Sequence, residues 1–291
     1  MAVVTGAGRG IGRAYARLLA QRGASVVVND LGGSMAGDGT DAGPASAVAA
    51  ELVAAGGAAI ADINDVSSPE GASALIDAAV EQLGRVDILI NNAGIIRWAG
   101  FPEADADNLA RHLAVHVAGS FNTARAVWPH MVERGYGRLV MTTSTGVFGL
   151  PANLSYATAK AAVIGLTRSL TTAGADHGIK VNLIAPAAST RMAGGAGPTE
   201  MSPELVAPMV AFLAHEACPV SGEIYAAGAG RFARIFVATT EGYVHAAPEA
   251  TIEDVAANWA TINDETGYLV PASLTDWSAA FMAHLPPREG Q

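Results

Sequence analysis

Short apolar runs alternate with segments of helical periodicity along most of this 291-residue chain. The apolar runs predict strands at 2–4, 26–29, 58–61, 86–90, 138–141, 180–184 and 223–226. The segments between them predict helices at 11–21, 45–54, 69–83, 103–133, 154–175 and 203–214. Strands joined by crossover helices form a parallel sheet with helices on both faces. The alternation therefore predicts a Rossmann-like, doubly wound α/β fold.

The length of the chain suits one large α/β domain, and we expect residues 1–291 to form a single domain with 231–291 as a C-terminal extension. The hydrophobic content of 51% suits helices packed on a buried sheet. Two pairs in the extension resemble capping boxes and predict helix starts, Thr251 with Asp254 and Ser273 with Asp276. We expect the extension to pack on the core or on a partner subunit.

Charge and cysteine content exclude several classes of protein. The net charge of −10 would repel the phosphates of a nucleic acid, and no basic stripe offsets it. Cys218 is the only cysteine, which excludes an internal disulfide framework and a cysteine-rich metal cluster. No apolar run reaches the roughly 20 residues of a spanning helix, and the chain does not open like a secretory signal. We therefore expect a soluble cytoplasmic protein that binds no nucleic acid, membrane or metal.

A glycine-rich turn follows the first predicted strand and opens the first predicted helix. It includes Gly6, Arg9, Gly10, Ile11 and Gly12. Small residues let the backbone approach a pyrophosphate, whose charge the N–H groups and dipole of the helix stabilise. A plain tight turn would have a similar sequence, so the position of the turn in the βα unit carries the prediction of a dinucleotide site.

An acidic residue, Asp30, ends the second predicted strand, 18 residues after Gly12. A carboxylate at this separation binds the adenosine ribose hydroxyls of NAD and repels the 2′-phosphate of NADP. Arg9 favours NADP instead, because a guanidinium near the ribose accommodates that phosphate. We expect NAD.

Three ordered motifs resemble the short-chain dehydrogenase/reductase family: Gly6-xxx-Gly10-x-Gly12, Asn91-Asn92-Ala93-Gly94 and Tyr156-xxx-Lys160. The resemblance extends from residue 1 to about residue 230. Further segments are similar to the (3R)-hydroxyacyl-CoA dehydrogenase module of peroxisomal multifunctional β-oxidation enzymes and its bacterial homologues, namely 29–33, 115–117, 119–121, 185–186, 191–192 and 215–218. The resemblance implies further cofactor contacts at Asn64 or Asp65, Val66, Asn91, Ala93, Gly94, Tyr156, Lys160, Pro186 and Thr190.

Tyr156 and Lys160 are four residues apart on a predicted helix, so their side chains share one face. A tyrosine with an ordinary pKa of about 10 is a poor base near neutrality. Lys160 and an oxidised nicotinamide are positive charges that would lower the pKa of the phenol. The phenol would then exchange a proton with an alcohol oxygen while hydride moves between the same carbon and NAD.

A third hydroxyl should hold the substrate oxygen, and either Ser144 or Thr143 fits. The family spacing falls on Thr143, whereas the residue type favours Ser144. The helix asparagine of the family is replaced by His116, which would relay protons near neutral pH or would simply be a satisfied buried histidine. No third metal ligand accompanies His112 and His116, and no G-x-S-x-G elbow supports a hydrolase triad.

These residues predict an NAD-dependent oxidoreductase that interconverts a secondary alcohol and a ketone, on a (3R)-hydroxyacyl-CoA or a steroid-like CoA ester. One alternative keeps the chemistry but takes a small free alcohol or a terpenoid ketone. Another is an NAD-binding sensor or assembly subunit without turnover, which the Tyr156–Lys160 pair disfavours because binding needs no phenolate. The long helices at 103–133 and 154–175 resemble those through which the family forms homodimers or homotetramers.

Overall fold

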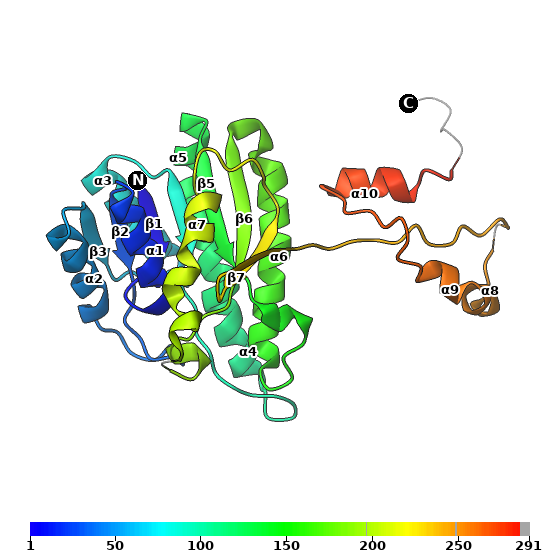
Figure 1. Cartoon of the computed structure of the whole chain (residues 1–291), viewed down its shortest axis with the longest axis horizontal. Coiled ribbons are helices and arrows are strands. Elements are labelled where there is room, and N and C mark those ends of the chain that lie inside the picture. The colour runs from blue at the N-terminus through cyan, green and yellow to red at the C-terminus, as the bar shows by residue number, and fades with distance from the viewer. Residues whose placement is uncertain (196, 248, 286–291) are drawn as a thin grey trace. The chain divides into compact units, whose positions relative to one another are not determined.

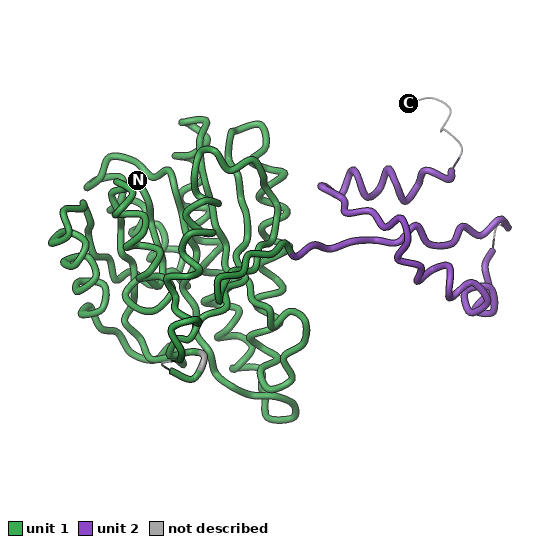
Figure 2. The backbone as a smooth tube through the Cα atoms, in the orientation of Figure 1, with its two compact units in different colours: residues 1–234 green, residues 235–291 purple. Residues whose placement is uncertain are grey.

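The computed structural model describes residues 1–195, 197–247 and 249–285. The chain divides into two compact units, residues 1–234 and 235–291 (Figure 2). The first unit holds the predicted sheet and all of the predicted site residues.

An eight-stranded sheet runs through the described part of the first unit (Figure 1). Its strands are β1 (Ala2–Thr5), β2 (Val26–Asn29), β3 (Ala59–Asp62), β4 (Ile88–Asn91), β5 (Gly137–Thr142), β6 (Ile179–Pro186), β7 (Ile224–Gly228) and β8 (Arg231–Ile235). The spatial order is β3-β2-β1-β4-β5-β6-β7-β8, and the strands from β3 to β7 pair in parallel. The order reverses between β1 and β4, which is where an open α/β sheet forms a ligand crevice. The doubly wound fold is confirmed.

Two helical layers cover the sheet (Figure 1). The helices are α1 (Gly10–Gln21), α2 (Gly43–Ala54), α3 (Pro69–Leu83), α4 (Ala106–His112), α5 (Gly119–Arg134), α6 (Leu154–Gly174) and α7 (Ala207–Leu213). Helices α1, α2 and α7 share one apolar core with the sheet, which buries Tyr15, Val48 and Leu213. On the other side α3 packs on α5, and α4 and α5 pack on α6. Strands β1, β2 and β5 are buried along their whole length, as their continuous apolar runs require.

The helix predicted over 103–133 is wrong in detail. It begins at Ala106, and a π-helical segment, Leu113–Ala118, separates α4 from α5. Apolar periodicity does not distinguish i→i+5 from i→i+4 bonding, and such insertions gather at functional sites. The helix predicted over 203–214 is likewise a 3-10 turn, Pro203–Leu205, followed by α7.

Strand β8 was not predicted. It follows β7 after two residues of positive φ, Ala229 at 50° and Gly230 at 73°. Its side chains are mostly exposed at the edge of the sheet, so the sequence lacks the apolar run that marks the buried strands.

The second unit holds three short helices, α8 (Ile252–Ala257), α9 (Trp259–Ile262) and α10 (Leu274–Phe281). The predicted capping box at Thr251 and Asp254 is complete, with each side chain accepting from the backbone N–H of the other. Ser273 caps α10 by accepting from the Asp276 N–H. Across the described residues of both units, no helix combines the length and apolarity needed to span a membrane.

Candidate active site

A cavity of about 540 Å³ lies at the carboxyl ends of β1, β2 and β4, on the crevice side of the sheet. It is lined by twelve of the residues predicted to contact a cofactor, namely Gly6, Arg9, Gly10, Ile11, Gly12, Asp30, Asn64, Asp65, Val66, Ala93, Gly94 and Thr190. The sequence motifs, which are up to 184 residues apart, therefore converge on one site.

The glycine-rich turn joins β1 to α1 along one wall of this cavity. Gly6 and Gly10 have positive φ values of 64° and 52°. A Cβ on Gly12 would lie 2.2 Å from the Gly6 carbonyl oxygen, so only glycine allows the helix to approach the turn this closely. Asn92 fixes the turn by donating from Nδ2 to the carbonyls of Thr5 and Gly6, at 3.0 and 3.1 Å.

The N-cap residue of α1 is Arg9, whose side chain makes no capping bond to the described backbone. The first N–H groups of α1 therefore lack a side-chain acceptor and border the cavity through Gly10 to Gly12. Such groups bind anions, and their charge is complementary to a pyrophosphate.

Asp30 joins the turn to the segment after β2. One carboxylate oxygen accepts from the Gly8 N–H at 2.8 Å and the other from the Gly32 N–H at 2.8 Å. The Arg9 guanidinium donates to the carbonyls of Gly32 and Gly33, at 3.4 and 3.3 Å. Both side chains line the cavity, so the acidic and the basic candidates for the ribose contact lie at the same end of it.

The other four predicted cofactor contacts, Asn91, Tyr156, Lys160 and Pro186, lie outside the described lining of the cavity. The Asn91 side chain is buried, where Oδ1 accepts from the Thr123 hydroxyl at 2.7 Å and Nδ2 donates to the Ser120 carbonyl at 3.3 Å. Its contacts therefore hold α5 against β4. Pro186 ends β6, four residues before Thr190.

Tyr156 and Lys160 lie one turn apart on α6, with the Lys160 Nζ 5.8 Å from the centre of the Tyr156 ring. The ammonium is 3% exposed and donates to the Thr142 carbonyl at 2.9 Å. Burial lowers the pKa of Lys160 to about 7. Burial also raises the pKa of Tyr156, and a side-chain hydrogen bond with Ser144 lowers it in part. The expected lowering by Lys160 is not seen, because desolvation of the phenolate dominates.

The two candidate hydroxyls at the end of β5 make different contacts. The Thr143 hydroxyl is buried and donates to the Lys160 carbonyl at 2.8 Å, which ties β5 to α6. Ser144 hydrogen-bonds the Tyr156 side chain and accepts from the Gly146 N–H at 3.0 Å. Ser144 therefore lies beside the phenol, whereas the Thr143 hydroxyl is committed to the backbone.

His112 and His116 stack on each other at a centroid distance of 5.9 Å and meet the Tyr156 ring edge-on. His112 Nδ1 lies 2.7 Å from the Asn108 carbonyl, while its Nε2 accepts from the Arg97 N–H. A carbonyl only accepts, so His112 is the neutral Nδ1–H tautomer. Among the described residues, no group of three or more His, Cys, Asp or Glu could hold a metal ion.

His116 is fully buried, and its Nε2 lies 2.9 Å from the Ile95 carbonyl and 3.3 Å from the Ile95 N–H. We assign the proton to Nε2 because the contact to the carbonyl is the shorter one. Burial and the nearby Lys160 lower the pKa of His116 well below its usual value. Of the two roles expected for His116, this burial favours a buried packing histidine over a proton relay. A Cβ on Gly94 would lie 2.6 Å from the His116 ring, so a glycine at position 94 leaves room for the imidazole.

The sequence analysis did not assign the other lining residues to the cofactor. They are Asn29, Leu31, Gly33, Ser34, Ala36, Gly37, Ser67, Asn92, Ile95, Arg111, Ala114, Val115, Arg191 and Met192. Half of these belong to the segment after β2 and to the π-helical region. The glycines of that segment were a usable signal for close backbone approach, but Arg111 had none, because its partner Asp38 is 73 residues away.

Residues 1–200 match the short chain dehydrogenase family. A putative short-chain type dehydrogenase/reductase of Mycobacterium tuberculosis is 41% identical over 270 residues, which are 91% of this chain and 94% of that protein. Peroxisomal multifunctional enzyme type 2 of Drosophila melanogaster is 40% identical over 91% of this chain. This chain spans only 45% of the fly enzyme.

Solved structures share the fold. The full-length fly enzyme has a TM-score of 0.80 at 31% identity, covering 97% of this chain and 48% of that one. A 7α-hydroxysteroid dehydrogenase complexed with NADH has a TM-score of 0.70 at 32% identity, over 79% of this chain and 92% of the other. A gluconate 5-dehydrogenase of Burkholderia cenocepacia complexed with NADP has a TM-score of 0.69 at 31% identity, over 79% and 93%.

The chain belongs to the short-chain dehydrogenase/reductase family. Members of this family are oxidoreductases that bind a nicotinamide cofactor and act on small molecules. Its relatives include multifunctional enzymes of peroxisomes, among them hydratase-dehydrogenase-epimerases.

Proposed function

We propose that the protein transfers hydride between NAD and the carbinol carbon of a secondary alcohol, with Tyr156 as the acid and base. The observation that carries this proposal is the contact of Ser144 with the Tyr156 phenol above the buried Lys160. A protein that only bound the cofactor would not need the ionisable Tyr156 phenol beside the Ser144 hydroxyl and the buried Lys160 ammonium. The arrangement therefore favours catalysis over the sensor or assembly alternative.

The residues around the cavity fit a nicotinamide dinucleotide. The uncapped N–H groups at the start of α1 border the cavity and could bind a pyrophosphate. A Cβ on Gly12 would clash with the glycine-rich turn beside them. Asn64, Asp65 and Val66 would border the adenine, and Thr190 the carboxamide. When bound, the cofactor supplies the hydride acceptor or donor.

NAD is proposed over NADP because of Asp30. Its carboxylate lines the cavity and would repel a 2′-phosphate. The Arg9 guanidinium, which would otherwise attract that phosphate, already donates to two backbone carbonyls. Both cofactors occur among similar solved structures, so the proposal rests on these two side chains.

The reaction assigns one task to each catalytic side chain. In oxidation, the Ser144 hydroxyl donates to the substrate oxygen and holds it beside the phenol. The Tyr156 oxygen would accept the O–H proton of the alcohol, and a bound cofactor would supply the acceptor for the C–H hydride. Reduction returns the proton from Tyr156 to the carbonyl oxygen. Lys160 in its ammonium form would stabilise the phenolate, and its pKa of about 7 lets that form exist near neutrality. His116 would act by packing against Tyr156.

We propose a CoA ester of a (3R)-3-hydroxy acid, or a steroid-like CoA ester, as the substrate. The similarity to multifunctional enzymes with a dehydrogenase activity supports this class. Apolar side chains at the substrate end also support it: Trp98 is 57% exposed and Phe148 is 74% exposed. The segments that carry them are joined by a backbone bridge between Ala99 and Asn153, close to Ser144 and Tyr156.

The test is turnover of a medium-chain (3R)-3-hydroxyacyl-CoA with NAD, compared with the same hydroxy acid without CoA. The proposal predicts a higher kcat/KM for the CoA ester. Equal or better activity on the free acid would refute the CoA proposal and favour a small free alcohol or a terpenoid ketone. NAD binding without turnover on a broad panel of alcohols and ketones would instead favour the sensor or assembly role.

We propose a cytoplasmic homodimer or homotetramer. Leu109 on α4 and Phe121 on α5 are apolar and 36% and 51% exposed, which suits a subunit interface on these helices. Sedimentation that shows only monomer would refute the oligomer.

A further inference from the structure

The segment between β2 and α2, residues 31–42, forms a strap along one wall of the cavity. The strap lines the cavity through Leu31, Gly33, Ser34, Ala36 and Gly37. The two ends of the strap meet closely, because a Cβ on Gly32 would lie 1.8 Å from the Asp41 carbonyl oxygen. The strap is therefore a folded element that a dinucleotide in the cavity would contact.

The strap is attached on both sides of the cavity. Arg9 donates to the carbonyls of Gly32 and Gly33 on the β2 side. On the β4 side, the Ile96 N–H donates to the Met35 carbonyl at 2.8 Å. Gly37 rests on the Ile95 side chain, where an added Cβ would lie 2.9 Å from Cγ2. These contacts attach the strap at one end to the turn after β1 and at the other to the segment that follows β4.

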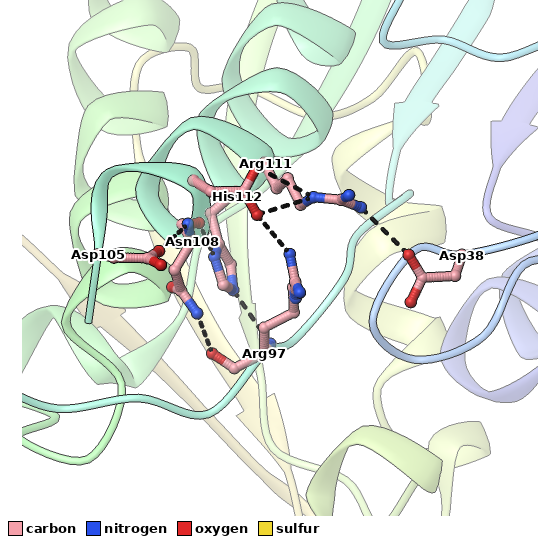
Figure 3. A network of polar contacts seen from close by, with 7 residues as sticks. Asp38, Arg97, Asp105, Asn108, Arg111 and His112 are labelled. Atoms are coloured by element: carbon pink, nitrogen blue, oxygen red, sulfur yellow. Dashed lines mark hydrogen bonds and ion pairs between the residues drawn. The ribbon is translucent and has the colours of Figure 1, made fainter. Parts of the chain in front are cut away.

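An ion pair ties the tip of the strap to helix α4. Arg111 Nη1 donates to Asp38 Oδ1 at 3.1 Å, and Arg111 Nε donates to Asp107 Oδ2 at 3.2 Å (Figure 3). The Arg111 guanidinium is therefore held between Asp38 and Asp107. Asp107 also accepts from Arg97 Nη1 at 3.0 Å. Arg111 lines the cavity, whereas Asp38 does not. Figure 3 shows Arg111 reaching from the helix towards Asp38 on the neighbouring loop.

We propose that the Asp38–Arg111 pair is a latch that holds the strap across the cavity, and that a bound nicotinamide dinucleotide leaves when the latch opens. This inference rests on the proposed function, since it needs the cavity to hold that cofactor. The strap lines the cavity and is bonded to the segment after β4. A ligand held against the strap would therefore leave more easily when the strap moves away. The ion pair is an exposed side-chain contact of this attachment, with side chains 45% and 62% exposed. It is therefore the contact that opens most readily.

The test is the dissociation rate of NADH, measured by stopped-flow fluorescence on the full chain. Asp38→Asn should raise this rate about two- to fivefold, the range that an exposed ion pair supports. Because Asp38 lies outside the cavity lining, its effect on NADH must pass through the strap. Loss of its negative charge alone would slow the release of an anionic ligand, so the latch and simple electrostatics predict opposite signs.

Two matched controls separate the latch from general destabilisation. Glu51→Gln removes an ion pair of similar exposure with Arg13 and Arg17, outside the cavity lining, and should leave the dissociation rate unchanged. Gly37→Ala should raise the rate more than Gly39→Ala. Both glycines have positive φ, but only a Cβ at position 37 meets Ile95.

A double variant, Asp38→Asn with Arg111→Gln, should release NADH no faster than Arg111→Gln alone. An unchanged or slower release from Asp38→Asn, in a protein that binds NADH, would overturn the latch and leave the proposed function in place. Failure of the unmodified protein to bind NADH would overturn both.

Discussion

Replacing Lys160 by methionine should stabilise the protein at neutral pH while it removes activity. The ammonium is buried, and its pKa falls from 10.5 to about 7. This lowering of the Lys160 pKa corresponds to a folding penalty of about 5 kcal/mol, because a tenfold change in the acidity constant is about 1.4 kcal/mol. The variant also loses the bond to the Thr142 carbonyl, which costs about 1 to 3 kcal/mol. The expected net gain at pH 7 is about 2 to 4 kcal/mol.

The pH dependence gives this prediction its sign. The unfolded lysine keeps its proton up to pH 10.5, whereas the folded lysine loses it near pH 7. Between these values the unfolded state binds more protons, so the folded wild type gains stability as pH rises. The penalty is full below about pH 7 and falls by about 1.4 kcal/mol per pH unit above it. The advantage of Lys160→Met should therefore shrink by about 3 kcal/mol between about pH 7 and 9.

The assay is urea unfolding of wild type and Lys160→Met at several pH values across that window. Lys180→Met is the control for loss of a lysine, because Lys180 is the other lysine of the chain and lies on β6, away from the cavity lining. A constant difference between the two stability curves would refute the reasoning. A variant that is less stable at every pH would refute it as well.

Three further predictions concern the other site residues. Asp30→Ala should weaken NADH binding about tenfold and raise the ratio of NADPH to NADH affinity, measured by fluorescence titration; an unchanged ratio would reject Asp30 as the selective residue. Ser144→Ala should lower kcat about 100-fold or more, whereas Thr143→Ala should mainly lower Tm, because the Thr143 hydroxyl bonds the Lys160 carbonyl; the reverse pattern would exchange their roles. His116→Gln should leave the shape of the pH–rate profile between about pH 6 and 8 unchanged, because burial lowers the pKa of His116 well below its usual value; loss of a titration there would show that His116 ionises during turnover.

Local signals in the sequence were sufficient for the fold and for twelve of the residues that line the cavity. The turn from Gly6 to Gly12 is a contiguous motif, and each strand is an apolar run with a helix after it. Motifs of this kind are read from neighbouring residues, so Asp30 and Thr190 fall at the cavity as expected.

Features that depend on long-range contacts were not accessible from the sequence. The choice between Ser144 and Thr143 depends on where α6 lies, because the Thr143 hydroxyl bonds a carbonyl 17 residues away. Asn91 turns inward because Thr123 and Ser120 lie on the helix behind it. The latch joins Asp38 to Arg111, and no periodicity links two exposed residues on separate elements. The pKa of Tyr156 depends mainly on the burial of its side chain, and burial cannot be read from the charged residues nearby in the sequence.

The most direct test of the proposed function compares Tyr156→Phe with wild type in NADH titration and in turnover with NAD and a (3R)-3-hydroxyacyl-CoA. The Tyr156 side chain lies outside the described cavity lining, so both proteins should bind NADH with similar Kd. Turnover by the variant should fall by about 100- to 10,000-fold, the contribution of a positioned acid or base. Turnover near the wild-type rate, with NADH binding intact, would contradict the assignment of Tyr156 and the mechanism built on it.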